Sequence, residues 1–288
     1  MIERVTGAWG KAVMRAVMMP VVAAFVALSL AAAAQAAGRD KVEAFLKVTG
    51  FDVALDSIAL AAEDAPAMLG MRADDFGYQW KRAAADVFDT AQMREMALGL
   101  LEKTLSDDLL DHAAGFYATP LGLRLVEAEN ISHLHEDDDA KRKAGDTLVD
   151  EMREGDPERM RMLARMNEAI DASGMGLKAV QEIQLRFLLA ADRAGVLHLK
   201  IDEDELRAML ARNEQEMRTS MAASALANSA WTYRDFSTGE LQTYTEALED
   251  DRMQQVYDLM NAIQWEIMAN RFEALATRMA GMTKGEEL

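Results

Sequence analysis

The sequence predicts an all-α protein, a multi-helix bundle of helical hairpins, on three observations. Apolar residues recur with the 3.6-residue spacing of helices along most of the chain, and no segment alternates as a β-strand does. Helix-capping residues recur where these segments begin. Only four prolines occur in 288 residues, so few helix interiors are interrupted.

The first 36 residues have the composition of a secretory signal peptide. Three basic side chains lie within residues 4–15, residues 16–34 are uncharged, and Ala34-Gln35-Ala36 supplies a small-x-small cleavage site. We therefore expect residues 1–36 to be removed and the mature chain to be periplasmic in a Gram-negative cell. An uncleaved inner-membrane signal anchor is the alternative, because the apolar run is long enough to span a bilayer.

Composition excludes several classes of function. The net charge is −18 and there is no cysteine. An acidic chain is poorly suited to nucleic acid or anionic lipid, and a cysteine-free chain has no thiol catalysis, thiolate metal site or disulfide. No second segment is apolar enough for stable membrane insertion. The 21 methionines fit either an adaptable binding face or ordinary core filling, which we favour.

The N-terminal helical half is expected to span residues 37–174. Ser106, Thr119 and Asp156 are N-cap residues, and the last two precede a proline at the first helical position, which is a strong start signal. A further helix is expected to begin at the N-cap Thr90. The expected helices cover residues 41–48, 53–62, 74–87, 90–104, 107–118, 120–131 and 157–172.

The C-terminal helical half is expected to span residues 175–288. Residues 177–194 are apolar on most sides, which is typical of a helix at the centre of a fold. Two capping boxes, residues 202–205 and 237–240, each begin a helix. The first helix is predicted to run to about Ser229. The second is predicted to run to about Met279, with a kink at Asp250-Asp251.

Comparing the sequence with itself at a shift of 131 residues reveals weak internal similarity. The shift aligns Ser106 with Ser237, Leu110 with Leu241 and Asn130 with Asn261, the last two pairs lying on predicted helices. Each segment could form one αα-hairpin. The C-terminal half is therefore either a degenerate repeat of the N-terminal half or unrelated to it.

No motif predicts a catalytic residue, a metal site or a cofactor. Gly174-Met175-Gly176 begins a dinucleotide-binding string, but a helix precedes it where a strand is required. His133 and His135 adjoin the acidic residues 136–139, yet side chains two positions apart diverge on a helix. Glu182 and Arg186, spaced i and i+4, are candidate ligand-binding residues. The structural alternative, which we favour, is a buried ion pair that fixes helix register.

Several sequence blocks carry a family resemblance. Residues 49–58, 65–70, 75–80 and 127–130, with the run Phe116-Tyr117-Ala118-Thr119-Pro120-Leu121-Gly122, resemble exported alphaproteobacterial proteins that carry the domain of unknown function 2059. The resemblance implies an all-helical periplasmic protein of unassigned role and supplies no catalytic residues. Within these blocks Trp80, Phe116, Tyr117 and Asn130 join Glu182 and Arg186 as candidate binding residues.

The sequence is compatible with three functions. The leading hypothesis is non-catalytic binding of an envelope protein or an apolar segment, which predicts an exposed apolar groove. A hydrolase-type enzyme with convergent carboxylates predicts a closed cleft with perturbed pKa values. A carrier of a small apolar ligand predicts an enclosed cavity of about 300–1,000 Å³. The sequence does not specify the oligomeric state.

Overall fold

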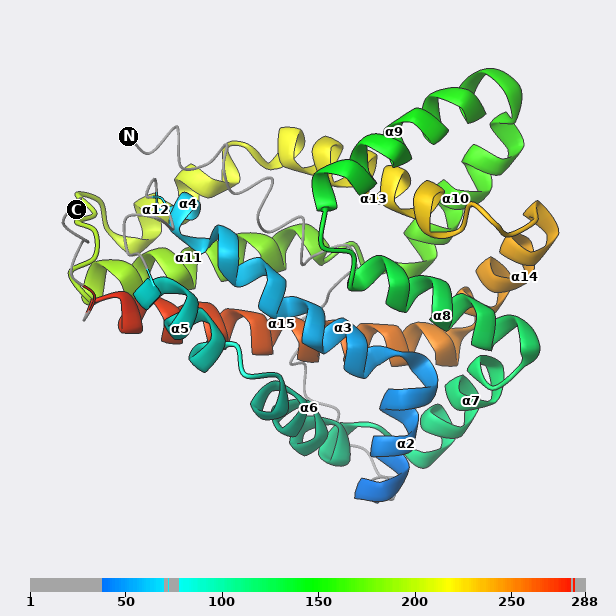
Figure 1. Cartoon of the computed structure of the whole chain (residues 1–288), viewed down its shortest axis with the longest axis horizontal. Coiled ribbons are helices and arrows are strands. Elements are labelled where there is room, and N and C mark those ends of the chain that lie inside the picture. The colour runs from blue at the N-terminus through cyan, green and yellow to red at the C-terminus, as the bar shows by residue number, and fades with distance from the viewer. Residues whose placement is uncertain (1–37, 70–71, 73–77, 281, 283–288) are drawn as a thin grey trace.

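The computed structural model describes residues 38–69, 72, 78–280 and 282, so the predicted signal peptide lies outside the described residues (Figure 1). Within these ranges the chain is all-helical and contains no strand, which confirms the predicted fold class. In chain order, the elements are α2 (Arg39–Thr49), α3 (Phe51–Ser57), the 3₁₀-helix η1 (Ile58–Asp64), α4 (Ala65–Met68), α5 (Tyr78–Val87), α6 (Thr90–Thr104), α7 (Asp107–Tyr117), α8 (Pro120–His133), α9 (Asp138–Gly155), α10 (Pro157–Ile170), α11 (Gly176–Arg193), α12 (Glu203–Ala211), α13 (Glu214–Thr232), α14 (Thr238–Leu248) and α15 (Asp251–Met279).

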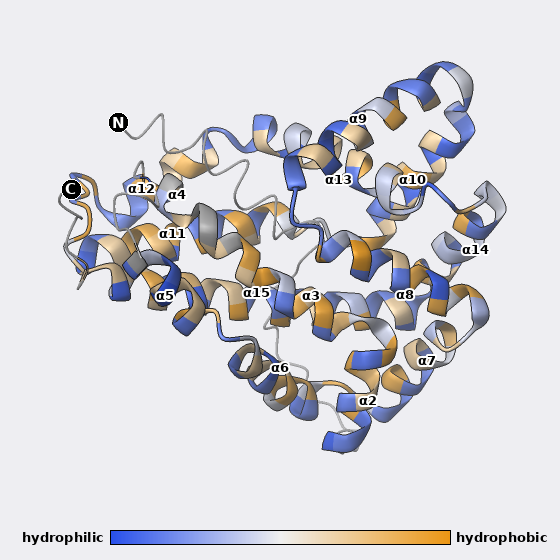
Figure 2. Cartoon of the chain, in the orientation of Figure 1, coloured by the Kyte–Doolittle hydropathy of each residue, from blue (hydrophilic) through white to orange (hydrophobic). Residues whose placement is uncertain are grey.

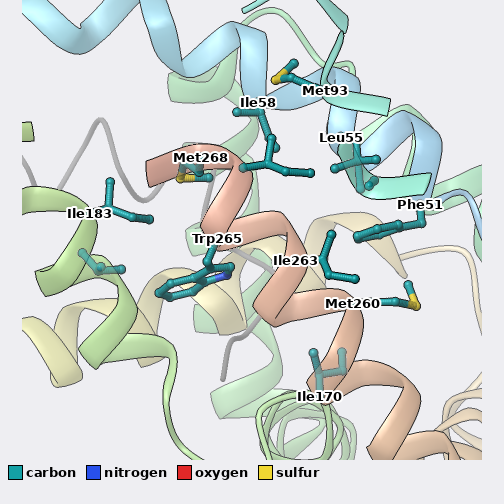
Figure 3. Close-up of a cluster of buried hydrophobic side chains, with 14 of the residues drawn as sticks. Phe51, Leu55, Ile58, Met93, Ile170, Ile183, Met260, Ile263, Trp265 and Met268 are labelled. Atoms are coloured by element: carbon teal, nitrogen blue, oxygen red, sulfur yellow. The ribbon is translucent and has the colours of Figure 1, made fainter. Parts of the chain in front are cut away.

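The long helix α15 is the central element of the bundle. Its 29 residues give a length of about 44 Å, and it packs against α5, α6, α7 and α11. More than half of its residues are buried, on every side except the one that carries Glu266, which is typical of a helix inside a fold. Figure 3 shows Met260, Ile263, Trp265 and Met268 of α15 among buried side chains of other helices. The predicted central helix, α11, is its main neighbour.

The helices α9, α10, α13 and α14 form a second group, at the upper right of Figure 1. Figure 2 shows that α9 is largely hydrophilic, as expected of a helix with one wide solvated side. The backbones of α9 and α13 are in close contact at Gly145. A Cβ added to this glycine would lie 2.2 Å from the carbonyl oxygen of Ala227. None of the helices in the described part of the chain combines the length and apolar character needed to span a bilayer.

Most predicted helix starts are present in the structure. Ser106, Thr119 and Asp156 each accept a hydrogen bond from the backbone N–H three residues later. Both predicted capping boxes form, at residues 202–205 and 237–240. The cap of α6 was misplaced by one residue: Asp89, rather than Thr90, accepts from Gln92 N–H at 2.7 Å.

The predicted continuous helix to Ser229 is wrong, since α12 and α13 are separated at Arg212 and Asn213. No glycine or proline marks this break. The two segments pack in different places: α12 buries Leu206 and Leu210 and lies against α11, whereas α13 lies against α9 and α10. Tertiary packing therefore sets the break, and local sequence does not signal it.

The shift of 131 residues also relates helix boundaries. The ranges of α7 and α14 correspond at both ends, and α8 and α15 begin at the corresponding residues Pro120 and Asp251. Their N-caps, Thr119 and Asp250, correspond as well. The buried core nevertheless combines residues from both sides of position 174, and the division of the chain there stays a prediction.

Candidate functional site

A buried carboxyl group, Glu129, lies on the inner face of α8. Its side chain is among the few buried ionisable groups, with the residue only 6 % exposed. The oxygen Oε1 lies within hydrogen-bond distance of the hydroxyls of Tyr233, at 2.7 Å, and Tyr244, at 2.9 Å. Tyr233 is the C-cap of α13 and Tyr244 belongs to α14, so Glu129 joins three helices.

The hydroxyls of two further tyrosines, Tyr117 and Tyr257, complete this cluster. Tyr117, the last residue of α7, lies 3.2 Å from Tyr244, oxygen to oxygen, and also contacts the hydroxyl of Tyr257 on α15. The hydroxyls of Tyr244 and Tyr257 are 3.0 Å apart. Phe116 stacks on Tyr244 with ring centres 5.8 Å apart. We call Glu129 with Tyr117, Tyr233, Tyr244 and Tyr257 the tyrosine cluster; it holds four of the chain's five tyrosines.

Burial perturbs the acid–base properties of this region. It raises the pKa of Glu129 to about 7, although the two tyrosine hydrogen bonds act in the opposite direction. It also raises the pKa of Tyr117, Tyr233 and Tyr244 well above the ordinary range. Burial, with a smaller effect of Lys141, lowers the pKa of His133 to about 4, so this imidazole is neutral at neutral pH.

A small polar cavity adjoins the tyrosine cluster. Its volume is about 10 Å³, which is the size of one water molecule. Asn130 lines it, and its buried Oδ1 has no hydrogen-bond partner among the described residues. Gly50 lies directly opposite: its φ is +71°, and an added Cβ would come within 2.6 Å of that oxygen. The cavity can hold one water-sized donor to Asn130, and it is too small for a substrate.

The outer face of α8 carries the exposed large apolar side chains of the described part of the chain. Leu123, Ile131 and the C-cap residue Leu134 are 55 %, 54 % and 54 % exposed. Their spacing puts them on one side of the helix, together with exposed Glu127. We call these four residues the α8 outer face. It lies opposite Glu129, so one helix carries both features.

Polar contacts fasten α8 to the rest of the molecule. The Thr232 hydroxyl donates to Ser132 at 2.8 Å, joining α13 to α8. Arg124 forms an ion pair with Glu240, and its guanidinium lies 4.8 Å from the centre of the Phe236 ring. These contacts hold α8 in place, so the α8 outer face has a fixed position on the surface.

A half-open groove of about 260 Å³ lies between α9, α10 and α13. Leu148, Met152 and Ala230 contribute apolar surface to it. Its arginines already have partners: Arg159 donates to the carbonyl oxygens of Phe236, at 2.6 Å, and Tyr233, at 2.7 Å. Among the described residues, no group of three or more acidic or histidine side chains is arranged to hold a metal ion.

Of the six residues predicted as binding candidates, three come together at the tyrosine cluster. Tyr117 belongs to it, Phe116 packs on it and Asn130 lines the adjoining cavity. Trp80 is buried in the core from α5. Whether any of the six binds a ligand stays a prediction.

Glu182 and Arg186 do not form the expected pair with each other. Glu182 pairs with Arg207 at 2.8 Å, whereas Arg186 pairs with Glu266, at 2.8 Å, and with Glu273. The reason is that partners on α12 and α15 reach the two side chains. These pairs are partly exposed and tie α11 to its neighbours.

Sequence reasoning missed Glu129, Tyr233, Tyr244 and Tyr257. One signal was available: Glu129 lies four and three positions after Leu125 and Val126, in the apolar register of α8. A carboxylate in that register indicates a buried acid. The three tyrosines come from separate elements, and nothing local indicates that they meet.

Comparison with known proteins finds a family model that matches part of this site. Residues 91–151 match DUF2059, described as an uncharacterized protein conserved in bacteria. The predicted resemblance to DUF2059 is thus confirmed over these residues, and the expected alphaproteobacterial origin stays a prediction. No curated protein and no solved structure matches the chain. The matched segment contains all of α6 except Thr90, the whole of α7 and α8, and most of α9. It therefore includes Tyr117, Glu129 and the α8 outer face.

Proposed function

We propose that this protein is a non-catalytic binding protein whose α8 outer face receives a cationic amphipathic helix of a partner protein. The observation that carries the proposal is the gathering of Leu123, Ile131 and Leu134 on one side of one helix. A helix that lays its apolar side on such a stripe buries side chains at matching intervals. Each fully buried leucine or isoleucine contributes about 1.5–3 kcal/mol.

Charge determines the chemistry of the proposed partner. Glu127 lies within the apolar stripe, and the exposed acidic residues Glu136 and Asp137 follow its C-terminal end. The chain as a whole has a net charge of −18. A partner helix with lysine or arginine beside its apolar side complements this surface and is steered toward it.

The dimensions of the described cavities favour binding over the two alternatives. The cavity beside Glu129, at about 10 Å³, is far below the roughly 300 Å³ needed to enclose a small ligand. Glu129 and His133 have perturbed pKa values there, but the cavity leaves no room for a substrate between them. The groove between α9, α10 and α13, at about 260 Å³, is half-open and does not enclose a small ligand. The proposed setting is the periplasm, which is supported by the composition of residues 1–36.

The test uses a synthetic leucine–lysine amphipathic peptide and its leucine–glutamate counterpart. NMR titration is expected to shift amides of α8 with the lysine peptide and not with the glutamate peptide. The variant L123S/I131S/L134S should weaken binding at least tenfold, which corresponds to about 1.4 kcal/mol. Ala208→Ser, at an exposed position of α12, is the matched control and should bind as wild type. Equal binding of both peptides, or no effect of the triple variant, would contradict the proposal.

A further inference from the structure

We infer that the tyrosine cluster holds five protons in the native state, the fifth being on Glu129, and that loss of this proton loosens the junction of α7, α8, α14 and α15. The cluster thus acts as a proton-dependent latch. This inference is independent of the proposed function.

The cluster has more oxygen–oxygen contacts than its phenols have protons. Five contacts link the cluster: Tyr233–Glu129, Tyr244–Glu129, Tyr117–Tyr244, Tyr117–Tyr257 and Tyr244–Tyr257. Each hydrogen bond uses one proton, and four phenols supply four. If Glu129 were ionised, one of the five contacts would join two oxygens with no hydrogen between them.

A neutral Glu129 satisfies all five contacts at once. Both contacts of the carboxyl group are made by Oε1. In the neutral form Tyr233 donates to Oε1, and the proton on Oε1 is donated to Tyr244, the reverse of the direction that an ionised Glu129 requires. Tyr244 then donates to Tyr117, Tyr117 to Tyr257 and Tyr257 back to Tyr244, which closes a ring. Every hydroxyl donates once in this arrangement. Removing the carboxyl proton breaks the ring, because Tyr244 must turn its hydrogen back toward Glu129.

The surroundings of Glu129 also favour the neutral form. The titratable groups that face it are Tyr117 from α7, Tyr244 from α14, Tyr257 from α15 and Tyr233 after α13. His133 lines the adjoining cavity and is neutral, and the α2–α3 corner contributes Thr49, Gly50 and Phe51, which do not titrate. None of these groups supplies a positive charge to stabilise a buried carboxylate, so burial disfavours ionisation.

The direction of the pH effect follows from linkage. The pKa of Glu129 is raised to about 7 in the folded chain, above its ordinary value of 4.5. Between these values the folded chain binds more protons than the unfolded chain, so stability falls as pH rises. The fall begins near the ordinary pKa and levels off above about pH 7. Asp171, whose pKa burial raises to about 6, contributes in the same direction, so a variant must isolate Glu129.

The test compares wild type with Glu129→Gln and with the control Glu127→Gln, which removes an exposed carboxylate two positions away on α8. Urea unfolding is measured from pH 5 to pH 8. Because glutamine is neutral and similar in shape, Glu129→Gln should lose less stability than wild type over this range and unfold at higher urea at pH 8. Glu127→Gln should follow the wild-type profile. A Glu129→Gln profile parallel to that of wild type overturns the inference.

A second measurement does not require a folded variant. Carboxyl ¹³C NMR of the wild-type protein, labelled at glutamate, should show one resonance that titrates well above the others. The same sample should show an infrared band of a protonated buried carboxylic acid at pH 6 that disappears by pH 9. If every glutamate titrates in the ordinary range, Glu129 is ionised at neutral pH and the latch does not exist.

Discussion

The α7–α8 corner and the α14–α15 corner have corresponding helix boundaries under a shift of 131 residues, but their second helices differ in burial. Each consists of an eleven-residue helix, a capped turn and a second helix. Yet α8 lies at the surface with an exposed outer face, whereas more than half of the residues of α15 are buried and only one side of it reaches solvent. Leu134, at 54 % exposed, corresponds to Trp265, at 4 %. The shared turn sets where a helix begins, and the residues around its circumference set how deeply it lies.

The inner positions of the two corners differ as well. Glu129 in α8 corresponds to Met260 in α15, and Val126 corresponds to Tyr257. The first corner therefore supplies Glu129 and Tyr117 to the tyrosine cluster, and the second supplies Tyr244 and Tyr257. Asn130 and Asn261 occupy corresponding positions, but Asn261 donates to the carbonyl oxygen of Ile170 at 3.4 Å whereas Asn130 faces the cavity.

The largest expected contrast is between Trp265 and Leu134. Trp265→Ala should destabilise the protein by about 3–5 kcal/mol, because it leaves a large cavity in the core. Leu134→Ala should change stability by no more than about 0.5 kcal/mol, since the side chain is half exposed. Denaturant unfolding of both variants provides the measurement. Equal losses would show that α8 is packed more tightly than its exposure indicates.

A smaller effect is expected at the turn of the first corner. A Cβ on Gly122 would lie 2.4 Å from the carbonyl oxygen of Phe116, so Gly122→Ala should cost about 1–3 kcal/mol through steric displacement. Gly115 has nothing within 4 Å of an added Cβ, and Gly115→Ala in the preceding helix should stabilise by about 0.5–1 kcal/mol. Thermal unfolding of the two variants gives the sign of each change. A stabilising Gly122→Ala would contradict the close contact.

The smallest contrast concerns the caps of the two corners. Thr119→Ala should cost about 1 kcal/mol at pH 7, and Asp250→Ala should also destabilise the protein at this pH. Backbone N–H donors hold the pKa of Asp250 below its ordinary value, so its contribution is present above the ordinary pKa and is lost as pH falls through the lowered one. The Asp250→Ala cost should therefore shrink toward pH 2, and the Thr119→Ala cost should not. Urea unfolding at both pH values distinguishes them; parallel profiles would count against the cap.

Local sequence was sufficient for the fold class and for most helix starts. Thr119 before Pro120 and the box at residues 237–240 signal their helices because capping chemistry acts over three or four residues. The break at Arg212–Asn213 was not predictable, because distant packing causes it. The same limit applies to the site: Glu129 was detectable from its register on α8, but Tyr233, Tyr244 and Tyr257 meet it only through the tertiary fold.

Arg159 gives the tyrosine cluster a support that differs from the surface ion pairs. It holds the carbonyl oxygens of Tyr233 and Phe236, and so fixes the turn that presents the Tyr233 hydroxyl to Glu129. Its partners are backbone dipoles, whereas Arg165 and Arg124 are balanced by the carboxylates of Glu249 and Glu240. Ionic strength screens attraction between exposed charges and acts less on a sheltered charge–dipole contact. Added salt should therefore weaken the ion pairs that join α14 and its C-cap to α10 and α8. The hydrogen bonds from Arg159 to the turn at Tyr233 should persist.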